Sequence, residues 1–582
     1  MFLFVDGCRG SWIRRGFERH GPSYPSGFYP CQDGFVFIAA LSQRPLSQSP
    51  WAGFLKLMGD PEWARSDPAL RDGAAIGWER ADEVDLQFIP WLLQFPRKEL
   101  IEKAAAVDGI NIGPVNSVHE LLDEEHLSER GFWTEVDIDG TQIRLPGLGY
   151  KLSRTPWHLG PAPQPITDLP ESRPTTTSRG FALADPVRPL DGLRVIEFGW
   201  NVAGPMVGQM LADFGAEVLR VETAKRPDYT RAIPHSRAHF EDLNRNKRSV
   251  TVDVTTTEGA QLIHRLARGS DIVFDNFAAG VLARYGLGEE ALRTTNSKLI
   301  VLSMAMAGQT GSLRHVRGFA TICTGFAGLE HAIGYPNIGP TGLPLIPLGD
   351  LNAAIQAVFA ILVALHHRER TGEGQFIDLS QIEAACALMA EPLIRFQLCG
   401  EKAEPCANAH PKMAPHGTYP AAGNDRWIAI SVRHDEDWQA LVDVMGFPEW
   451  ACAEALTRTQ DRLRCRDQID HHLSEWSHLH DRDQLAAALQ AAGVPAAPVL
   501  EMSEVFAHPH FKERGLELRW QTNAAPEGAW RLYNTPWHLS ATPRQVRSPA
   551  PALGADNAYV FGEILNLPER ELRRLVQAGV IR

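Results

Sequence analysis

The sequence has few cysteines, and none of them is placed for a metal site or a redox pair. No two of the eight form a C-x-x-C pair, and none stands in a zinc-like cluster with histidine. Structural zinc sites and redox dithiols both need such close spacing. We therefore interpret the cysteines as reduced packing residues and expect no bound metal.

Two further absences concern membranes and nucleic acids. The longest apolar run, Ala353 to Leu365, is shorter than the roughly 20 residues that cross a bilayer. The first residues, MFLFVDGCRGSWIRRG, do not have the pattern of a signal peptide. The net charge of −13 disfavours the basic face that nucleic acids require. These features predict a cytoplasmic protein with no membrane or nucleic-acid partner.

From Pro189 onward, short apolar runs alternate with helical patterns. LRVIEF, EVLRVE, SVTVDV, DIVFDNF and LIVLSM have the composition of buried strands, and helices are expected between them. This alternation predicts an α/β fold with a doubly wound parallel sheet, which binds its ligands at the carboxyl ends of the strands. The G-x-G-x-x-G fingerprint is absent from FGWNVAGP, so a nicotinamide cofactor is not expected.

The chain contains an internal repeat. The matching stretches are GFYPCQDGFVFIA at Gly27 with GTYPAAGNDRWIA at Gly417, MGDPEW at Met58 with MGFPEW at Met445, GINIGPV at Gly109 with GVPAAPV at Gly493, and TPWHL at Thr155 and Thr535. The offsets keep their order and fall only from 390 to 380 residues. This regularity predicts a duplicated small domain.

The repeat and the composition together predict five segments. Residues 1–165 form a first copy of a small α+β domain, and 166–188 form a linker rich in proline and threonine. Residues 189–400 form a Rossmann-like large domain, and 401–545 form the second small-domain copy. Residues 546–582 form a helical tail that is expected to return to the large domain.

Asp350 stands immediately before a long apolar helix and after Gly349. Aspartate is a favoured N-cap, and its charge suits the positive end of a helix. A carboxylate at such a position is also suited to nucleophilic attack, because the adjacent glycine lets a ligand approach the backbone closely. The two interpretations are compatible, and the residues alone leave both open.

The region from Pro189 to the C-terminus resembles the family III CoA-transferases, the CaiB/BaiF group. The stretches that carry the resemblance are PLDGLRVIEFGWNVAGPMVGQMLADFGAEVLRVE, NRNKRSVTVDVTTTEG, DIVFDNFAAGVLARYGLG, PLGDLNAAIQAVFAILVALHHRERTGEGQFIDLS and GVPAAPVLEMSEVFAHPHFKERG. They occur in the order found in that family.

The resemblance implies the family's fold and a set of site residues. Asp350 matches the nucleophile of the family. The positions that match CoA contacts are Val202, Ala203, Val252, Asp253, Thr255, Asn276, Phe277, Ala278, Arg284 and Arg317. From the residues alone, Asn276 fits a turn or cap after a strand equally well, and Arg284 fits a helix-surface charge. Lys247 and Arg248 fit either a solvated charge run or a basic cluster for the CoA phosphates.

Three positions depart from the pattern. The formyl-CoA enzyme carries glutamine before AGP, where this chain has Val202, preceded by Asn201. Ala320 replaces an acidic or amide residue, and a glycine-rich loop is not evident. These changes favour an acceptor acid larger or more apolar than oxalate. His315 stands 35 residues before Asp350, but its surroundings do not match the racemase branch, which ranks lower.

The implied reaction moves CoA from an acyl-CoA donor to a carboxylic acid through an aspartyl anhydride and thioester. It needs no permanently bound cofactor, since coenzyme A and acyl-CoA are substrates. The alternatives are an isomerase, racemase or lyase on the same fold, or an inactive CoA-binding remnant of a tandem fusion. Family members form interlocked dimers, so we expect an interlocked homodimer, or a monomer whose first small domain takes the partner's place.

Overall fold

The computed structural model describes most of the chain, as two compact units. The described residues are 23–39, 49–77, 79–107, 110–161, 188–231, 237–336, 338–343, 347–521, 528–534, 537–542 and 546–582. The first unit comprises Met1–Ala332, Pro340–Ala403 and Leu518–Arg582, and the second comprises Ile333–Gly339 and Glu404–Glu517. The expected linker 166–188 lies outside the described residues except for Arg188.

A seven-stranded sheet forms the centre of the first unit, in the order β6-β14-β11-β10-β7-β8-β9. Its strands are β6 (Tyr150–Leu152), β7 (Arg194–Phe198), β8 (Glu217–Glu222), β9 (Arg248–Thr251), β10 (Ile272–Asp275), β11 (Ile300–Ala305) and β14 (Phe376–Ser380). All neighbours are parallel except β6, which pairs antiparallel with β14. The predicted α/β fold with a doubly wound parallel sheet is confirmed.

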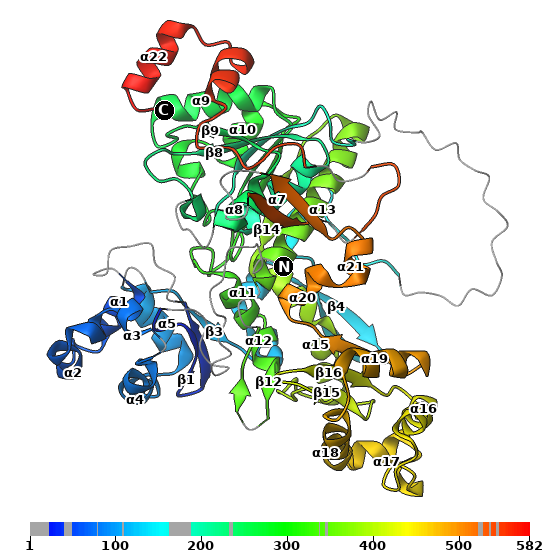
Figure 1. Ribbon diagram of the computed structural model, residues 1–582. Coiled ribbons are helices and arrows are strands. Elements are labelled where there is room, and N and C mark those ends of the chain that lie inside the picture. The colour runs from blue at the N-terminus through cyan, green and yellow to red at the C-terminus, as the bar shows by residue number, and fades with distance from the viewer. Residues whose placement is uncertain are drawn as a thin grey trace. The chain divides into compact units, whose positions relative to one another are not determined.

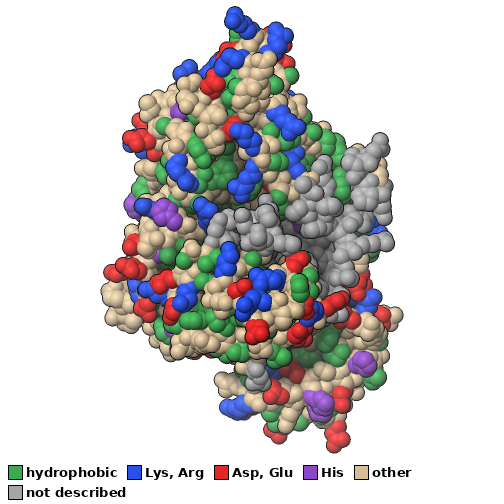
Figure 2. All heavy atoms as spheres, turned by 90° about the vertical axis from the view of Figure 1, so that its left-hand side faces the viewer, with side chains coloured by type: hydrophobic (Ala, Val, Ile, Leu, Met, Phe, Trp, Pro, Cys, Tyr) green, Lys and Arg blue, Asp and Glu red, His purple; other side chains and the backbone are tan. Residues whose placement is uncertain are grey.

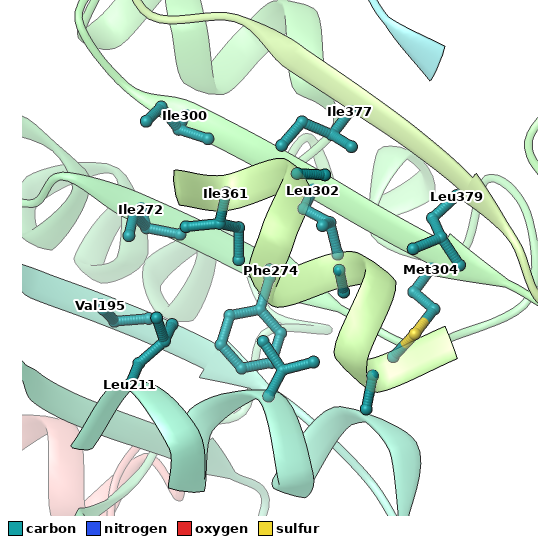
Figure 3. Packing of buried hydrophobic residues seen from close by; sticks show 14 of the residues in the cluster. Val195, Leu211, Ile272, Phe274, Ile300, Leu302, Met304, Ile361, Ile377 and Leu379 are labelled. Carbon is teal, nitrogen blue, oxygen red and sulfur yellow. The ribbon is translucent and has the colours of Figure 1, made fainter. Parts of the chain in front are cut away.

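Helices cover both faces of this sheet. The helices of the large domain are α7 (Ala203–Asp213), α8 (Arg237–Asn244), α9 (Thr257–Arg268), α10 (Glu289–Thr295), α11 (Ala320–Phe326), α12 (Leu329–Ala332), α13 (Leu348–Thr371), α14 (Gln381–Cys386) and α15 (Ala390–Cys399). On one face α7 and α13 pack against the strands, with Leu211 and Ile361 directed at Phe274 and its neighbours (Figure 3). On the other face, α9 and the C-terminal tail pack against the same strands.

Helix α13 is long and apolar enough to cross a membrane by length and composition, contrary to the expectation from its apolar run in the sequence. Its alanines at 353, 354, 357, 360 and 364 are fully buried in the main core. They let the helix lie close to the sheet, so packing inside the protein explains the apolar character of this face. The opposite side of the helix exposes Ile355, Phe359 and Leu362.

The N-terminal segment of the first unit has its own three-stranded antiparallel sheet, β1-β2-β3. Its elements are β1 (Gly27–Cys31), β2 (Gly34–Ile38), α1 (Pro50–Leu57), α2 (Glu62–Ser66), η2 (Pro68–Arg71), α3 (Gly73–Ile76), α4 (Ala81–Leu92), α5 (Arg97–Ala105) and β3 (Ile112–Val115), then η3 (Val118–Asp123), α6 (Glu125–Glu129) and the hairpin β4 (Trp133–Ile138) and β5 (Thr141–Pro146). An aromatic cluster around Trp51 and Phe88 fills its core. Figure 1 shows β1 beside α1, α4 and α5.

Buried polar contacts attach this N-terminal segment to the large domain. The Arg130 guanidinium is fully buried and binds Glu383 through two hydrogen bonds of 2.7 and 3.0 Å. It also contacts Asp378 at 3.0 Å. The Asn116 amide donates to the Phe326 carbonyl of α11 at 3.0 Å. Together with β6, these contacts join the N-terminal segment and the large domain into a single body.

The second unit has a three-stranded antiparallel sheet of its own. Its strands β15 (His416–Pro420), β16 (Trp427–Ser431) and β17 (Ala496–Val499) form an antiparallel sheet in the order β15-β16-β17. Its helices are α16 (Asp435–Met445), η8 (Glu454–Leu456), α17 (Thr459–Arg464), α18 (Arg466–Ser477), α19 (Arg482–Ala491), α20 (Met502–Ala507) and α21 (Pro509–Glu513). The hairpin and returning third strand match β1-β2-β3 in order and direction.

The chain ends on the first unit. The ribbon β18 (Glu517–Gln521) and β19 (Ala529–Tyr533) precedes the tail, which contains η9 (Ala558–Ile564) and α22 (Glu569–Gln577). Val560, Phe561 and Leu575 are buried against β8, β9 and α9. On the face drawn in Figure 2, basic and acidic side chains are interspersed, as on an ordinary protein surface.

Candidate active site

The predicted site residues gather at the carboxyl ends of the parallel strands. Val202 and Ala203 follow β7 at the start of α7. Val252 to Thr255 follow β9, and Asn276 to Ala278 follow β10. Asp350 lies at the start of α13, which runs back along the sheet between β11 and β14 and so begins at the same edge. This edge is where doubly wound sheets bind ligands.

Asp350 does not cap its helix, contrary to the sequence interpretation. The helix begins at Leu348, with Pro347 in the cap position and no side-chain cap bond. Asp350 is the acidic residue of the first turn, where the helix dipole still favours its ionised form. The Leu351 N–H donates to the Pro347 carbonyl at 3.0 Å, so the backbone donors left over at this end precede Leu351.

Gly349 lets the start of α13 approach α11 closely. A Cβ atom at this position would lie 2.8 Å from the Ala320 carbonyl oxygen and 3.2 Å from the Cys323 Cβ. No ordinary side chain fits such a gap. The glycine before Asp350 therefore sets the distance between the two helices, and the carboxylate is held against α11.

The Asp350 carboxyl group lies in a half-buried site with one weak polar partner. Its Oδ1 accepts a hydrogen bond from the Gln381 amide at 3.4 Å. Burial raises the pKa of Asp350 to about 7, and the Gln381 hydrogen bond opposes this rise. The neighbouring Cys323 thiol is buried, and burial, together with the charge of Asp350, holds its pKa well above the usual value. The site therefore places a nearly unpaired carboxyl group in a poorly hydrated setting.

Asn276 holds the loop after β7. Its Oδ1 accepts from the Trp200 N–H at 2.8 Å, and its Nδ2 donates to the Trp200 carbonyl at 2.9 Å. A Cβ at Gly204 would lie 2.7 Å from the same amide oxygen, which explains the glycine of the AGP motif. The Asn276 side chain thus fixes the start of α7, and the neighbouring backbone faces the edge of the sheet.

The segments after β9 and β10 are fixed by short-range hydrogen bonds. Asp253 accepts from the Thr255 hydroxyl and from the Lys225 ammonium, both at 2.6 Å, and these hydrogen bonds keep the pKa of Asp253 below its usual range. Asp275 accepts from the Phe277 N–H at 3.0 Å, while burial raises the pKa of Asp275 to about 6. Both segments are therefore rigid before any ligand binds.

Lys247 is neither a solvated charge nor a surface ligand for phosphate. Its ammonium is buried and binds Glu197 at 2.9 Å, the Pro205 carbonyl at 2.7 Å and the Asn244 amide oxygen at 3.0 Å. Burial lowers the pKa of Lys247 to about 8. Its neighbour Arg248 pairs with Asp556 of the tail. In the basic run of the sequence, Lys247 therefore makes contacts in the core, and Arg248 binds the C-terminal tail.

Other cations remain exposed near the same edge. Arg284 lies in η6 (Ala283–Tyr285) after β10, and Arg317 lies in the loop between β11 and α11. Both are exposed, and neither guanidinium has an ion-pair partner within the described parts of the chain. His315 is exposed as well and accepts a hydrogen bond from the adjacent Arg314 side chain at 3.0 Å. The Nε2 atom of the His315 ring is therefore already used in a hydrogen bond.

Two residues of this site were missed by sequence reasoning. Gln381, the first residue of α14, is the hydrogen-bond partner of Asp350. Gln381 directly follows the strand FIDLS, and this position at the carboxyl edge of the sheet could have indicated a role in the site. Lys225 follows β8 and pairs with Asp253 in the predicted CoA segment. Among the described residues, no cluster of three or more His, Cys, Asp or Glu could hold a metal ion.

Comparison with known proteins decides the family. The model of CoA-transferase family III matches residues 9–168 and 190–557. The chain belongs to this family. It is therefore an acyl-CoA:carboxylate CoA-transferase, which uses acyl-CoA as a substrate.

Similar proteins cover different shares of this chain. A succinyl-CoA–D-citramalate CoA-transferase of Chloroflexus aurantiacus is 36% identical over 68% of this chain and 99% of its own length. A probable CoA-transferase of Mycobacterium tuberculosis is 27% identical over 99% of this chain but only 72% of its own length. The crystal structure of a CaiB/BaiF family protein from Brucella suis matches with a TM-score of 0.59 and 33% identity, covering 65% of this chain and 99% of that one.

Proposed function

We propose that the transferase acts through Asp350 as its nucleophile. The observation that carries this proposal is that the Asp350 carboxyl group has only a weak hydrogen-bond partner among the described residues. It is held at 3.4 Å by one amide, whereas buried carboxylates nearby have strong partners, such as Asp228 with Arg220 at 2.7 Å. A carboxylate that is poorly hydrated and poorly paired is a better nucleophile than one in a salt bridge.

The reaction proceeds by exchange at carbonyl carbons. An Asp350 oxygen attacks the thioester carbonyl of the donor, the C–S bond breaks, and CoA leaves as the thiolate with the electron pair. The thiolate then attacks the Asp350 carbonyl of the mixed anhydride, which releases the donor acid and leaves an aspartyl thioester. The acceptor carboxylate attacks that thioester to give a second anhydride, and the thiolate attacks its acceptor carbonyl to form the new acyl-CoA and free Asp350.

Each step needs an oxyanion to be stabilised and water to be excluded. The N–H groups of Gly349 and Asp350 lie in the first turn of α13, where helical hydrogen bonding leaves donors over. These N–H groups are the proposed donors to the anionic oxygen. Gln381 orients the carboxylate by its hydrogen bond to Oδ1.

CoA lies along the carboxyl edge in this proposal. The rigid segments after β7, β9 and β10 offer Val202, Ala203, Val252, Asp253, Thr255, Asn276, Phe277 and Ala278 as its contacts. The exposed Arg284 and Arg317 are suited to its phosphates, because guanidinium groups pair well with phosphate oxygens. Lys225 adds a cation beside Asp253.

Succinyl-CoA is the donor that we would test first. It is named in the succinyl-CoA–D-citramalate CoA-transferase, which is 36% identical. The proposed acceptor is a carboxylic acid larger than oxalate, because Val202 and Ala320 make the neighbourhood of Asp350 less polar. A panel of acyl-CoA esters with hydroxylamine trapping and peptide mass spectrometry would identify the donor through a hydroxamate at Asp350.

Replacement of the nucleophile tests the proposal directly. Asp350→Ala should abolish turnover of succinyl-CoA with a dicarboxylic acceptor, while binding of CoA measured by calorimetry stays within about twofold, because CoA contacts other segments. Normal turnover in this variant would rule out Asp350 as the nucleophile. Loss of CoA binding together with activity would point instead to a structural role.

The N-terminal small domain is proposed to be a duplicate that completes the first unit. Two observations support this. The sheets β1-β2-β3 and β15-β16-β17 have the same order, and the family model matches two separate ranges of the chain. The buried Arg130 and the strand β6 tie this domain to the large domain.

The assembly is either an interlocked homodimer or a monomer that uses its own duplicated domain, and the exposed stripe of α13 favours association with another surface. Light scattering distinguishes the two. We propose a cytoplasmic location, which the free cysteines of the described residues support.

A further inference from the structure

Asn201 has an unusual backbone conformation at the edge where Asp350 lies. Its φ is +63°, in the left-handed region, between β7 and α7. Asparagine tolerates this region better than most residues, and such conformations cluster at functional sites. The Asn201 N–H donates to Asp228 Oδ2 at 3.0 Å, which holds the conformation in place.

A buried ion-pair network anchors that contact. Asp228 is fully buried and pairs with Arg220 at 2.7 Å, and its other oxygen accepts from the Thr230 N–H at 3.0 Å. Arg220 is fully buried and also binds Glu197 and Glu222. The position of the Asn201 backbone is therefore set by the core.

The side chain of Asn201 is oriented as well. Its Oδ1 accepts a hydrogen bond from the Tyr229 hydroxyl at 2.8 Å. The Tyr229 ring packs edge-on against the Trp200 ring at 6.4 Å between centroids, so the phenol is held on two sides. With the oxygen occupied, the Nδ2 group of Asn201 faces the other way, and it donates to no acceptor within the described residues.

Asn201 directly precedes the start of α7, and Asp350 lies in the first turn of α13, at the same edge of the sheet. Val202 and Leu351, the neighbours of Asn201 and Asp350, pack against the same core cluster, and α7 and α13 lie side by side (Figure 3). The charge of Asp350 reaches Tyr229, where it joins burial and Asp228 in raising the pKa of the phenol. Tyr229 and Asn201 are both half-buried, so both side chains keep some exposure to solvent.

We propose that Asn201 Nδ2 donates a hydrogen bond to the carbonyl oxygen of the acyl group that Asp350 attacks, and that Tyr229 positions it. The inference rests on the proposed function. The amide proton stays on Nδ2 throughout, while the carbonyl oxygen gains negative charge as the tetrahedral intermediate forms, so the hydrogen bond strengthens in the transition state. Position 202 carries valine and offers no amide, so Asn201 supplies one from the preceding residue in the left-handed conformation.

The test compares single-turnover release of CoA from succinyl-CoA by wild type and Asn201→Gly. Glycine accepts the left-handed backbone without strain and lacks the amide. We expect CoA release to slow about 100-fold, as for loss of one oxyanion donor. The dissociation constant for CoA and the melting temperature should stay close to those of wild type. Asn566→Gly, an exposed residue of the tail with φ +49°, is the matched control and should not change the rate.

Two further variants separate the roles of donor and positioning residue. Tyr229→Phe keeps the ring but frees the Asn201 amide, and we expect a slowing of about tenfold, seen in kcat and not in the KM for succinyl-CoA. Asn201→Asp keeps an acceptor for Tyr229 but replaces the donor with an anion, so it should be at least as slow as Asn201→Gly.

The two ways in which the test can fail are distinguishable. A wild-type rate in Asn201→Gly, with an active wild-type protein, overturns this inference alone. A wild-type protein that forms no hydroxamate at Asp350 with any acyl-CoA ester overturns the proposed function, and this inference with it.

Discussion

At the scale of single residues, the charge state of Asp350 should control the rate. Only the ionised form attacks a thioester, and burial raises its pKa to about 7. We therefore expect kcat/KM to fall about tenfold for each pH unit below 7, where the carboxyl group holds its proton, and to level off above pH 8. An aspartate with the usual pKa would give no change between pH 5 and 8. Stopped-flow measurement of CoA release across this range checks the profile.

A second variant tests whether the pKa of Asp350 causes this pH profile. The Gln381 hydrogen bond lowers the pKa of Asp350, so Gln381→Leu should move the midpoint of the profile to higher pH. Binding of CoA, measured over the same range, controls for titration of the ligand. A flat profile in wild type would contradict the raised pKa.

Sequence reasoning located Asp350 but not its surroundings. The glycine, the carboxylate and the apolar helix are adjacent in the chain, so their grouping is visible in the sequence. Gln381 comes from another strand end, and only the fold brings it to Asp350. The same limit explains Lys247, whose burial depends on Glu197, 50 residues earlier. The sequence interpretation placed the N-cap at Asp350, which is three positions after the observed cap residue, Pro347. Helix α13 begins at Leu348.

At the scale of elements, the contact between α11 and α13 should be sensitive to one methyl group. Gly349→Ala would place a Cβ 2.8 Å from the Ala320 carbonyl oxygen, which is backbone and cannot move aside cheaply. We expect a loss of about 1–3 kcal/mol in the free energy of unfolding and at least a tenfold lower kcat, because Asp350 shifts with its helix.

The control for this prediction is Gly562→Ala in the tail. A Cβ there would meet no atom within 4 Å, so stability and activity should not change. Urea unfolding and turnover of both variants check the comparison. Equal behaviour of the two variants would show that the close approach of α11 and α13 is not needed.

The parallel strands of the large domain were predictable for a physical reason. Each is buried on both faces and therefore reads as a continuous apolar run, as in LRVIEF. Strand β6 was not predicted, because Tyr150–Leu152 is short and carries Lys151. Its partner is 229 residues away in the chain, from Tyr150 to Leu379, and no local pattern shows such a pairing.

At the scale of the whole molecule, the buried cation Arg130 should hold the N-terminal segment in place. Arg130→Ala would leave Glu383 and Asp378 buried without their partner. We expect a loss of about 3–5 kcal/mol in the free energy of unfolding, which is typical of breaking a buried pair from one side. Arg395→Ala breaks a solvent-exposed pair with Glu391 and should cost much less, because exposed ion pairs contribute little to stability. Urea unfolding of both variants tests this, and equal losses would contradict the structural role of Arg130.

Strand β6 has a consequence for how the protein is made. The first third of the chain leaves the ribosome with this edge strand unpaired, and its partner β14 is not yet synthesised. At about 5–20 residues per second, the 229 residues between Tyr150 and Leu379 take roughly 10–50 s to translate. For that interval the nascent chain has an open strand and an unpaired Arg130. A chaperone that shields this segment should therefore raise the yield of native protein more than one acting after release.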